Sequence, residues 1–243
     1  MRRRQFIKKY SLLLSIVIVS LPQMAFSQHS ISNEELIGKG TPKLFGEGYL
    51  LREEAHLAFL KMKKDALKVG IKIGIVSSYR SYEHQNRIWE RKFKRYKSQG
   101  FSEENTIKKI IEYSTIPGTS RHHWGTDIDI YDSNTKQPKN VLAPSNYLGN
   151  GAFCKLKEWM DLNAKNYGFH IVYTNNANRK GFKYEPWHYS YRPLSVDFLK
   201  QYKTLAIKEI LKKEKLVGNN SVSESFINNY ISENILDINP ELL

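Results

Sequence analysis

A segment with one apolar face and one acidic face constrains the fold of this chain more than any other feature. Residues 126–131 alternate, so that Ile128 and Ile130 face one way and Asp127 and Asp129 face the other. This period of two predicts a strand whose isoleucines enter a hydrophobic core. Buried carboxylates need partners, and a metal ion is an economical one. The chain must therefore bring donors or a cation to one face of a sheet.

Helices and short strands follow one another along the chain without an internal repeat. Apolar residues three and four apart predict the helices, and short alternating runs predict the strands. The predicted helices span 51–69, 82–97, 103–113, 153–167 and 193–216, and the predicted strands span 71–76, 126–131, 169–173 and 187–189. The helices at 82–97 and 103–113 form an insertion between strands. This order indicates a mixed α+β class.

The first residues predict a secretory signal peptide. A basic start precedes an apolar stretch, Ser11 to Leu21, which is shorter than the roughly 20 residues that span a bilayer. Small residues place cleavage after Ser27, and a retained membrane anchor stays the alternative. We expect an exported, periplasmic or secreted protein with a signal peptide at 1–27, one main domain at 28–205 and a helical tail at 206–243.

The tail follows a linker at 218–221 and is only weakly amphipathic. Its modest apolar content argues against a separate folded unit. Whether it packs on the main domain or stays mobile is open at this point.

The chain is strongly basic, with a formal net charge of +14. The predicted signal peptide holds five basic and no acidic residues, which leaves +9 after its removal. The lysines are scattered and form no arginine-aromatic cluster, so we expect no nucleic-acid binding beyond weak charge attraction. Peripheral attraction to an anionic cell envelope is consistent with this charge. Cys154, the single cysteine, cannot form an intrachain disulfide, and we expect a monomer.

Two short segments hold residue types that bind zinc. His122 and Asp129 lie seven residues apart, in a loop and in the strand that it enters, and Glu185 and His188 lie three residues apart. Catalytic zinc usually takes three protein ligands and leaves a position for water, which a nearby base can deprotonate. Pro186 marks a kink that lets both neighbouring side chains reach one centre.

Together these segments resemble the zinc D-alanyl-D-alanine carboxypeptidases of the vancomycin-resistance, VanY-like type, which share a fold with lysostaphin-type peptidases and the hedgehog signalling domain. That family reads Ser-x-His-x-x-Gly-x-Ala-x-Asp, then Glu-x-x-His, and has an earlier Tyr-Arg-Ser turn followed by a glutamine. The residues that match this pattern are Ser120, His122, Gly125, Asp129, Glu185 and His188, and the earlier turn is matched by Tyr79, Arg80, Ser81 and Gln85. The resemblance covers about 70–192. It implies a small antiparallel sheet that carries the zinc site and is flanked by helices.

The resemblance also implies roles for the matched residues. One zinc ion per chain would be held by His122, Asp129 and His188. Glu185 would act as general base on the water that the metal activates, and Arg80 would stabilise the developing oxyanion without titrating.

Further matched residues are expected to contact substrate. Ser120 and Gln85 resemble the positions that hold the terminal carboxylate and the backbone of the substrate, and Trp187 would wall the pocket. The implied activity is removal of a terminal D-alanine from peptidoglycan stem peptides within a zinc peptidase domain at 28–205. An L,D-carboxypeptidase or an endopeptidase of the same fold stays open, as does a non-catalytic zinc-containing module that binds wall peptides or a protein. The presence of both Glu185 and Arg80 favours an enzyme.

One position departs from the family pattern. The usual alanine two residues before the aspartate ligand is Asp127 here. Asp127 could replace Asp129 as ligand, orient a ligand histidine or contact an amino group of the substrate. We keep Asp129 as ligand and place Asp127 among the substrate contacts. His123 is expected to line the pocket or to be structural.

The remaining histidines have no assigned role. They lie outside both motifs and are His29, His56, His84 and His170.

Overall fold

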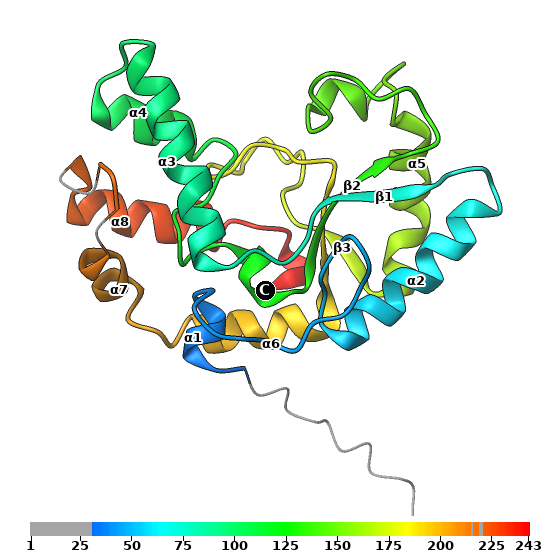
Figure 1. The fold of residues 1–243 in the computed structure, drawn as a ribbon, viewed down its shortest axis with the longest axis horizontal. Helices are drawn as coiled ribbons and strands as arrows, with labels where there is room; N and C mark the ends of the chain where they lie inside the picture. Colours follow the sequence, from blue (N-terminus) through cyan, green and yellow to red (C-terminus); the bar gives the residue numbers. More distant parts are fainter. Residues whose placement is uncertain (1–30, 215, 219–220) are drawn as a thin grey trace, which may run out of the picture.

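The computed structural model describes residues 31–214, 216–218 and 221–243 (Figure 1). The predicted signal peptide at 1–27 and its cleavage site lie outside these residues. Among the residues that are described, no helix is both long enough and apolar enough to span a membrane.

Eight α-helices surround one small sheet in the described part of the chain. The helices are α1 (Asn33–Leu36), α2 (Glu53–Leu67), α3 (Tyr82–Ser98), α4 (Glu103–Ile110), α5 (Cys154–Asn163), α6 (Arg192–Tyr202), α7 (Ile207–Lys213) and α8 (Glu224–Tyr230). The strands are β1 (Ile73–Ser77), β2 (Asp127–Asp132), β3 (Phe169–Ile171) and β4 (His188–Tyr191). The short 3-10 turns are η1 (Arg121–Trp124), η2 (Pro144–Asn146), η3 (Ala164–Tyr167) and η6 (Pro240–Leu242), and η5 (Ile231–Ile235) is a π-helical turn.

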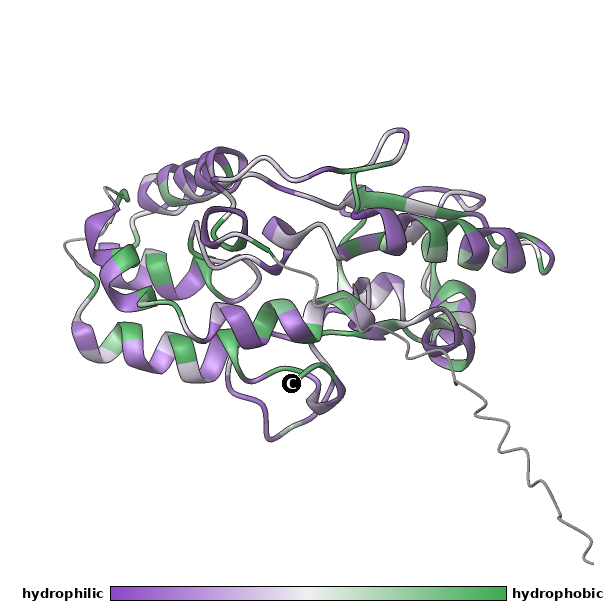
Figure 2. Cartoon of the chain, turned by 90° about the horizontal axis from the view of Figure 1, so that it is seen from below, coloured by the Kyte–Doolittle hydropathy of each residue, from purple (hydrophilic) through white to green (hydrophobic). Residues whose placement is uncertain are grey.

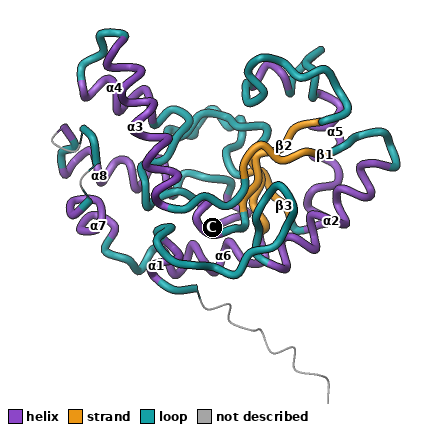
Figure 3. Tube along the Cα trace, in the orientation of Figure 1, coloured by secondary structure: helices purple, strands orange, loops and turns teal. Residues whose placement is uncertain are grey.

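The four strands form one antiparallel sheet in the order β1-β2-β4-β3. This confirms the predicted α+β class and the small antiparallel sheet flanked by helices. Figure 3 draws the strands in orange among the helices. In the central pair, Asp129 of β2 lies opposite His188 of β4, and Asp127 lies opposite Ser190. Residues that lie directly opposite in a pair point to the same face of the sheet. The pairing of β2 with β4 therefore collects acidic, imidazole and hydroxyl groups on one face.

The other face of the sheet is apolar. Ile128 and Ile130 of β2 and Tyr189 of β4 are at most 2% exposed and pack in one hydrophobic cluster with residues of α2 and α5. Figure 1 shows these two helices on the same side of the sheet. The alternation predicted for β2 is confirmed.

A second hydrophobic cluster lies on the opposite side, among α3, α4, α6, α7 and α8. In Figure 2 the helices carry hydrophobic stripes beside hydrophilic ones, as amphipathic helices around a core do. The apolar residues of α3 differ in burial. Trp89 and Phe93 are buried, whereas Ile88 and Tyr96 are only half-buried because they line a cavity.

The helix predicted at 193–216 is wrong as one element, since it breaks after Tyr202 into α6 and α7. The break lets Ile207 and Leu211 turn into the second cluster.

The C-terminal residues 221–243 pack on the rest of the chain. Leu242 has no exposed surface, and Ile227 and Tyr230 belong to the second cluster. A Cβ on Gly181 would lie 1.7 Å from the carbonyl oxygen of Glu233, so the two backbones are in direct contact there. The tail is thus part of the core that supports the loops beside the sheet.

Tyr230 ties the tail to the loop that precedes η1. Its hydroxyl accepts a hydrogen bond from the backbone N–H of Ile116 (3.0 Å) and lies 2.8 Å from Oγ1 of Thr119. Thr119 donates to the carbonyl of Ile116 (2.7 Å), so Tyr230 is the donor in the pair of hydroxyls.

Replacing Tyr230 with phenylalanine should lower the free energy of unfolding by about 1–3 kcal/mol, because it leaves the buried Ile116 N–H without an acceptor. Chemical denaturation measures the change. Tyr131→Phe is the control, since among the described residues its hydroxyl has no hydrogen-bond partner, and it should change stability by less than about 0.5 kcal/mol. Equal effects of the two substitutions would contradict this role of Tyr230.

Candidate metal centre

A tight turn positions His122 above the sheet. His122 lies on η1, which ends at Gly125 in the left-handed conformation (φ 68°) before the chain enters β2. A Cβ at Gly125 would lie 2.8 Å from Cδ2 of Leu44, so both conformation and space favour glycine. This accounts for the glycine in the first motif.

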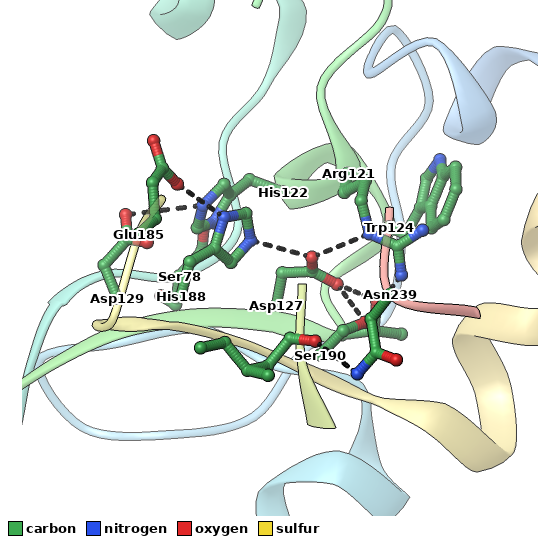
Figure 4. A network of polar contacts seen from close by, with 12 residues as sticks. Ser78, Arg121, His122, Trp124, Asp127, Asp129, Glu185, His188, Ser190 and Asn239 are labelled. Carbon is green, nitrogen blue, oxygen red and sulfur yellow. Dashed lines mark hydrogen bonds and ion pairs between the residues drawn. The ribbon is translucent and has the colours of Figure 1, made fainter. Parts of the chain in front are cut away.

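Three side chains converge on the polar face of the sheet. One donor atom each from His122, Asp129 and His188 lies within 4.8 Å of the others, and all three residues are buried (Figure 4). Nε2 of His122 is 3.4 Å from Oδ2 of Asp129. The rings of His122 and His188 are stacked with centroids 4.7 Å apart. The structure therefore brings together the three predicted ligands.

The proton of His122 points away from this group. Nδ1 of His122 lies 2.7 Å from the carbonyl oxygen of Ser78, which only accepts hydrogen bonds, so Nδ1 carries the proton. Burial lowers the pKa of His122, which favours the neutral ring. Its Nε2 lone pair then faces a carboxylate oxygen of Asp129, and two acceptors meet without a proton between them. A cation satisfies both, and two imidazoles with one carboxylate are a donor set that suits zinc.

His188 is held between two carboxylates. Its Nε2 lies 2.9 Å from Oδ2 of Asp127, and its Nδ1 lies 3.0 Å from Oε2 of Glu185. Burial alone would lower the pKa of His188, but these carboxylates outweigh it and raise the pKa to about 9 in the metal-free protein. Since the buried Asp127 engages Nε2, a metal would bind Nδ1 in place of its contact with Glu185.

All four hydrogen-bonding positions of the Asp127 carboxylate are engaged. Oδ2 accepts from His188 and from Nε of Arg121 (3.1 Å), and Oδ1 accepts from Thr126 (2.8 Å) and Ser190 (2.6 Å). Burial opposes its charge, but Arg121 and His188 hold the pKa of Asp127 well below its usual range.

This geometry corrects the expected substrate contact. Asp127 has no exposed surface and orients His188 instead. Asp129 is free to bind a metal, because His122 is the one side chain in close polar contact with its carboxylate among the described residues.

Glu185 reaches the same centre through a turn. The N–H of His188 donates to the carbonyl of Glu185 (3.1 Å), which brings both side chains to one side of the chain. This is the kink expected at Pro186. Burial is the main cause that raises the pKa of Glu185.

Arg80 is fixed by its backbone and its side chain. Its N–H donates to the carbonyl of His122 (3.1 Å), and its carbonyl accepts from Nδ1 of His123 (2.6 Å). Its Nη1 donates to Oε1 of Gln85 (2.7 Å), whose amide donates to the carbonyl of Thr115 (2.8 Å).

Two expectations are settled by these contacts. Gln85 has no exposed surface and does not line the cavity, so the expected substrate contact by Gln85 is wrong and its role is to hold Arg80. His123 is structural, and burial lowers its pKa to about 3.

A cavity of about 700 Å³ opens onto the centre. Trp187 and Ser120, the predicted pocket wall and substrate contact, both line it. Three buried polar atoms along it have no partner among the described residues, namely Oγ of Ser120, Nε of Arg80 and Nη1 of Arg121. Sequence reasoning missed Arg121, whose position beside His122 was the available signal. These atoms are suited to bind the carboxylate or carbonyl oxygens of a ligand.

Known proteins resemble this chain in sequence. A family model described as VanY, D-alanyl-D-alanine carboxypeptidase, matches residues 48–194. A protein of Haemophilus influenzae described as uncharacterized is 32% identical over 42% of this chain and 80% of its own length. A D-alanyl-D-alanine carboxypeptidase of Enterococcus faecalis is 26% identical over 58% of this chain, and a putative carboxypeptidase, YodJ, of Bacillus subtilis is 29% identical over 69%. The matches span about half the length of the last two proteins, 48% and 55%.

Solved structures share the fold. VanYB in complex with D-alanine-D-alanine superposes with a TM-score of 0.53 at 22% identity, over 73% of this chain and 92% of that one. A vancomycin-resistance D,D-pentapeptidase VanY variant in complex with Zn(II) gives a TM-score of 0.51 at 22% identity, over 70% and 90%.

Replacing Asp127 with asparagine should weaken zinc binding by about 10–100-fold, because His188 loses the carboxylate that fixes its ring. Asp129→Asn removes a ligand and should weaken binding further. Competition with a chelator measures both affinities, with circular dichroism as the check on folding. Stronger loss of zinc from the variant at Asp127 than from that at Asp129 would reverse the two roles.

Proposed function

Because this chain belongs to the VanY family of D-alanyl-D-alanine carboxypeptidases, we propose that it is a zinc-dependent carboxypeptidase that removes a terminal D-alanine from peptidoglycan stem peptides. Membership of the family confirms the resemblance drawn from the motifs. The observation that carries the proposal is Glu185 lying against a His-Asp-His group at the base of a cavity. The complex of VanYB with D-alanine-D-alanine supports the substrate class.

In this proposal His122, Asp129 and His188 hold one zinc ion per chain. When bound, zinc supplies a Lewis acid that polarises a carbonyl and makes water more acidic. Glu185 takes a proton from the attacking water and returns it to the leaving amine. Its raised pKa favours this exchange, since a carboxylate of ordinary pKa is a weaker base at neutral pH. No covalent bond to the protein forms.

The unpartnered polar atoms of the cavity bind the substrate. The guanidinium of Arg80 stays charged throughout and is fixed by Gln85, so it can stabilise the oxyanion that develops on the scissile carbonyl. Ser120 and Arg121 offer buried donors to the terminal carboxylate of the substrate. Trp187 packs between Tyr113 and Tyr147, with centroids 6.3 and 5.6 Å away, and gives the pocket a rigid wall.

We further propose that the protein is exported and acts in the periplasm or outside the cell. The basic and apolar pattern of residues 1–27 supports this, and export would bring the enzyme to peptidoglycan.

Zinc-loaded protein should release D-alanine from a synthetic stem pentapeptide that ends in D-alanyl-D-alanine. Glu185→Gln should lower kcat by about 10²–10⁴-fold, since it removes the base but keeps the size of the side chain. Quantification of released D-alanine measures the rate, and metal analysis of each sample confirms equal zinc content. Zinc binding without release of a terminal residue would contradict the proposal and favour an endopeptidase or a binding module.

A further inference from the structure

One wall of the cavity is a basic stripe along α3. His84, Arg91, Lys92 and Arg95 all line the cavity, together with the apolar Ile88. Their spacing of three and four residues places them on one face of the helix. At 1.5 Å per residue, the stripe from residue 84 to residue 95 is about 17 Å long. Its positive charge lies at Arg91, Lys92 and Arg95, because burial and nearby arginines lower the pKa of His84.

This basic wall has no acidic counterpart in the cavity. The acidic residues that line the cavity are Asp129 and Glu185, and both belong to the candidate metal centre. Within the described ranges, Arg91, Lys92 and Arg95 form no ion pair with a carboxylate. The cations therefore have no ion-pair partner in the described part of the chain, and Glu185 of the candidate centre acts on Lys92 only through its charge.

The acidic residues of α3 lie elsewhere on the helix. Glu83 and Glu90 do not line the cavity, and Glu90 accepts a hydrogen bond from Asn86 on the exposed side. An ordinary solvated helix face mixes both signs of charge. Here only the positive charges of the helix face the cavity.

Two of the cations are held in place. Nζ of Lys92 donates to Oγ of Ser114, in the loop that leads to η1, and burial lowers the pKa of Lys92 to about 8, which leaves most of it protonated at pH 7. The guanidinium of Arg95 lies 4.7 Å from the ring centroid of Tyr96 and donates to its hydroxyl (2.8 Å). Positions fixed in this way suit the binding of a carboxylate.

We infer that the basic wall of α3 is a subsite for a carboxylate that the substrate peptide carries upstream of its scissile bond, so that the site selects acidic over amidated peptides. The inference rests on the proposed function, because the peptide occupies the cavity with its C-terminal end at the metal centre. An extended peptide rises about 3.3 Å per residue, so a stripe of about 17 Å runs beside roughly five residues. The carboxylate of a residue a few positions before the scissile bond then reaches the guanidinium groups.

The test uses pairs of hexapeptides that end in D-alanyl-D-alanine and carry glutamate or glutamine at the third, fourth or fifth residue from the C-terminus. Binding is measured by calorimetry with the zinc-loaded Glu185→Gln protein, in which turnover is suppressed. We expect the glutamate peptide to bind about tenfold more tightly than its glutamine partner at one or more of these positions, with a smaller ratio at high salt.

Substitutions on the two faces of α3 provide the matched comparison. The double substitution Arg91→Gln and Arg95→Gln is made in the Glu185→Gln protein. It should reduce the ratio of the affinities for the glutamate and glutamine peptides to about twofold or less. Arg87→Gln with Lys94→Gln removes the same charge from exposed positions of α3 that do not line the cavity, and should keep the ratio.

Three results would overturn the subsite. They are glutamate and glutamine peptides that bind equally at every position, glutamate peptides that bind at none of the three positions, and a control pair that lowers the ratio as much as the cavity pair. Hydrolysis of the same peptides by the zinc-loaded wild-type protein is scored separately. Discrimination in binding without release of D-alanine would contradict the proposed function and leave the subsite standing.

Discussion

The contact between Asp127 and His188 is the interaction on which the candidate centre depends. The pairing of β2 with β4 sets both residues on one face of the sheet, and the carboxylate of Asp127 accepts a hydrogen bond from Nε2 of the His188 ring. That leaves Nδ1 turned toward Glu185 and Asp129 (Figure 4). A shift of the register by one residue would send these side chains into the apolar cluster on the other face. The isoleucines of β2 therefore help to define the metal site, because their burial fixes the register.

The rest of the structure holds the groups that meet this face. The turn of η1 places His122, and the same turn fixes the backbone of Arg80 through hydrogen bonds to residues 122 and 123. The C-terminal helices support the loop before η1 through the buried hydroxyl of Tyr230. Residues far apart in sequence thus share one task, which is to keep the cavity and its polar groups rigid. Preorganised charges of this kind stabilise a developing charge without having to reorganise.

Much of this arrangement could be predicted from the sequence, because it follows from local patterns. The period of two in β2 predicted its two faces, and the spacing within the motifs predicted the three residues that converge. The sequence left the orientation of a histidine open as one of three roles for Asp127. It could not select this role, since the role depends on Arg121 and Ser190, and the hydroxyl of Ser190 comes from a strand some sixty residues away. Gln85 was misjudged for the same reason. Its side chain turns to a backbone carbonyl of a loop that no local pattern places beside α3.

We propose that one aspartate of β2 binds the metal while the other orients a histidine. A crystal structure of the zinc-loaded protein tests it most directly. We expect zinc bonded to His122, Asp129 and Nδ1 of His188, with Asp127 still on Nε2 of the same ring. Zinc bonded to Asp127, or to Nε2 of His188, would contradict it.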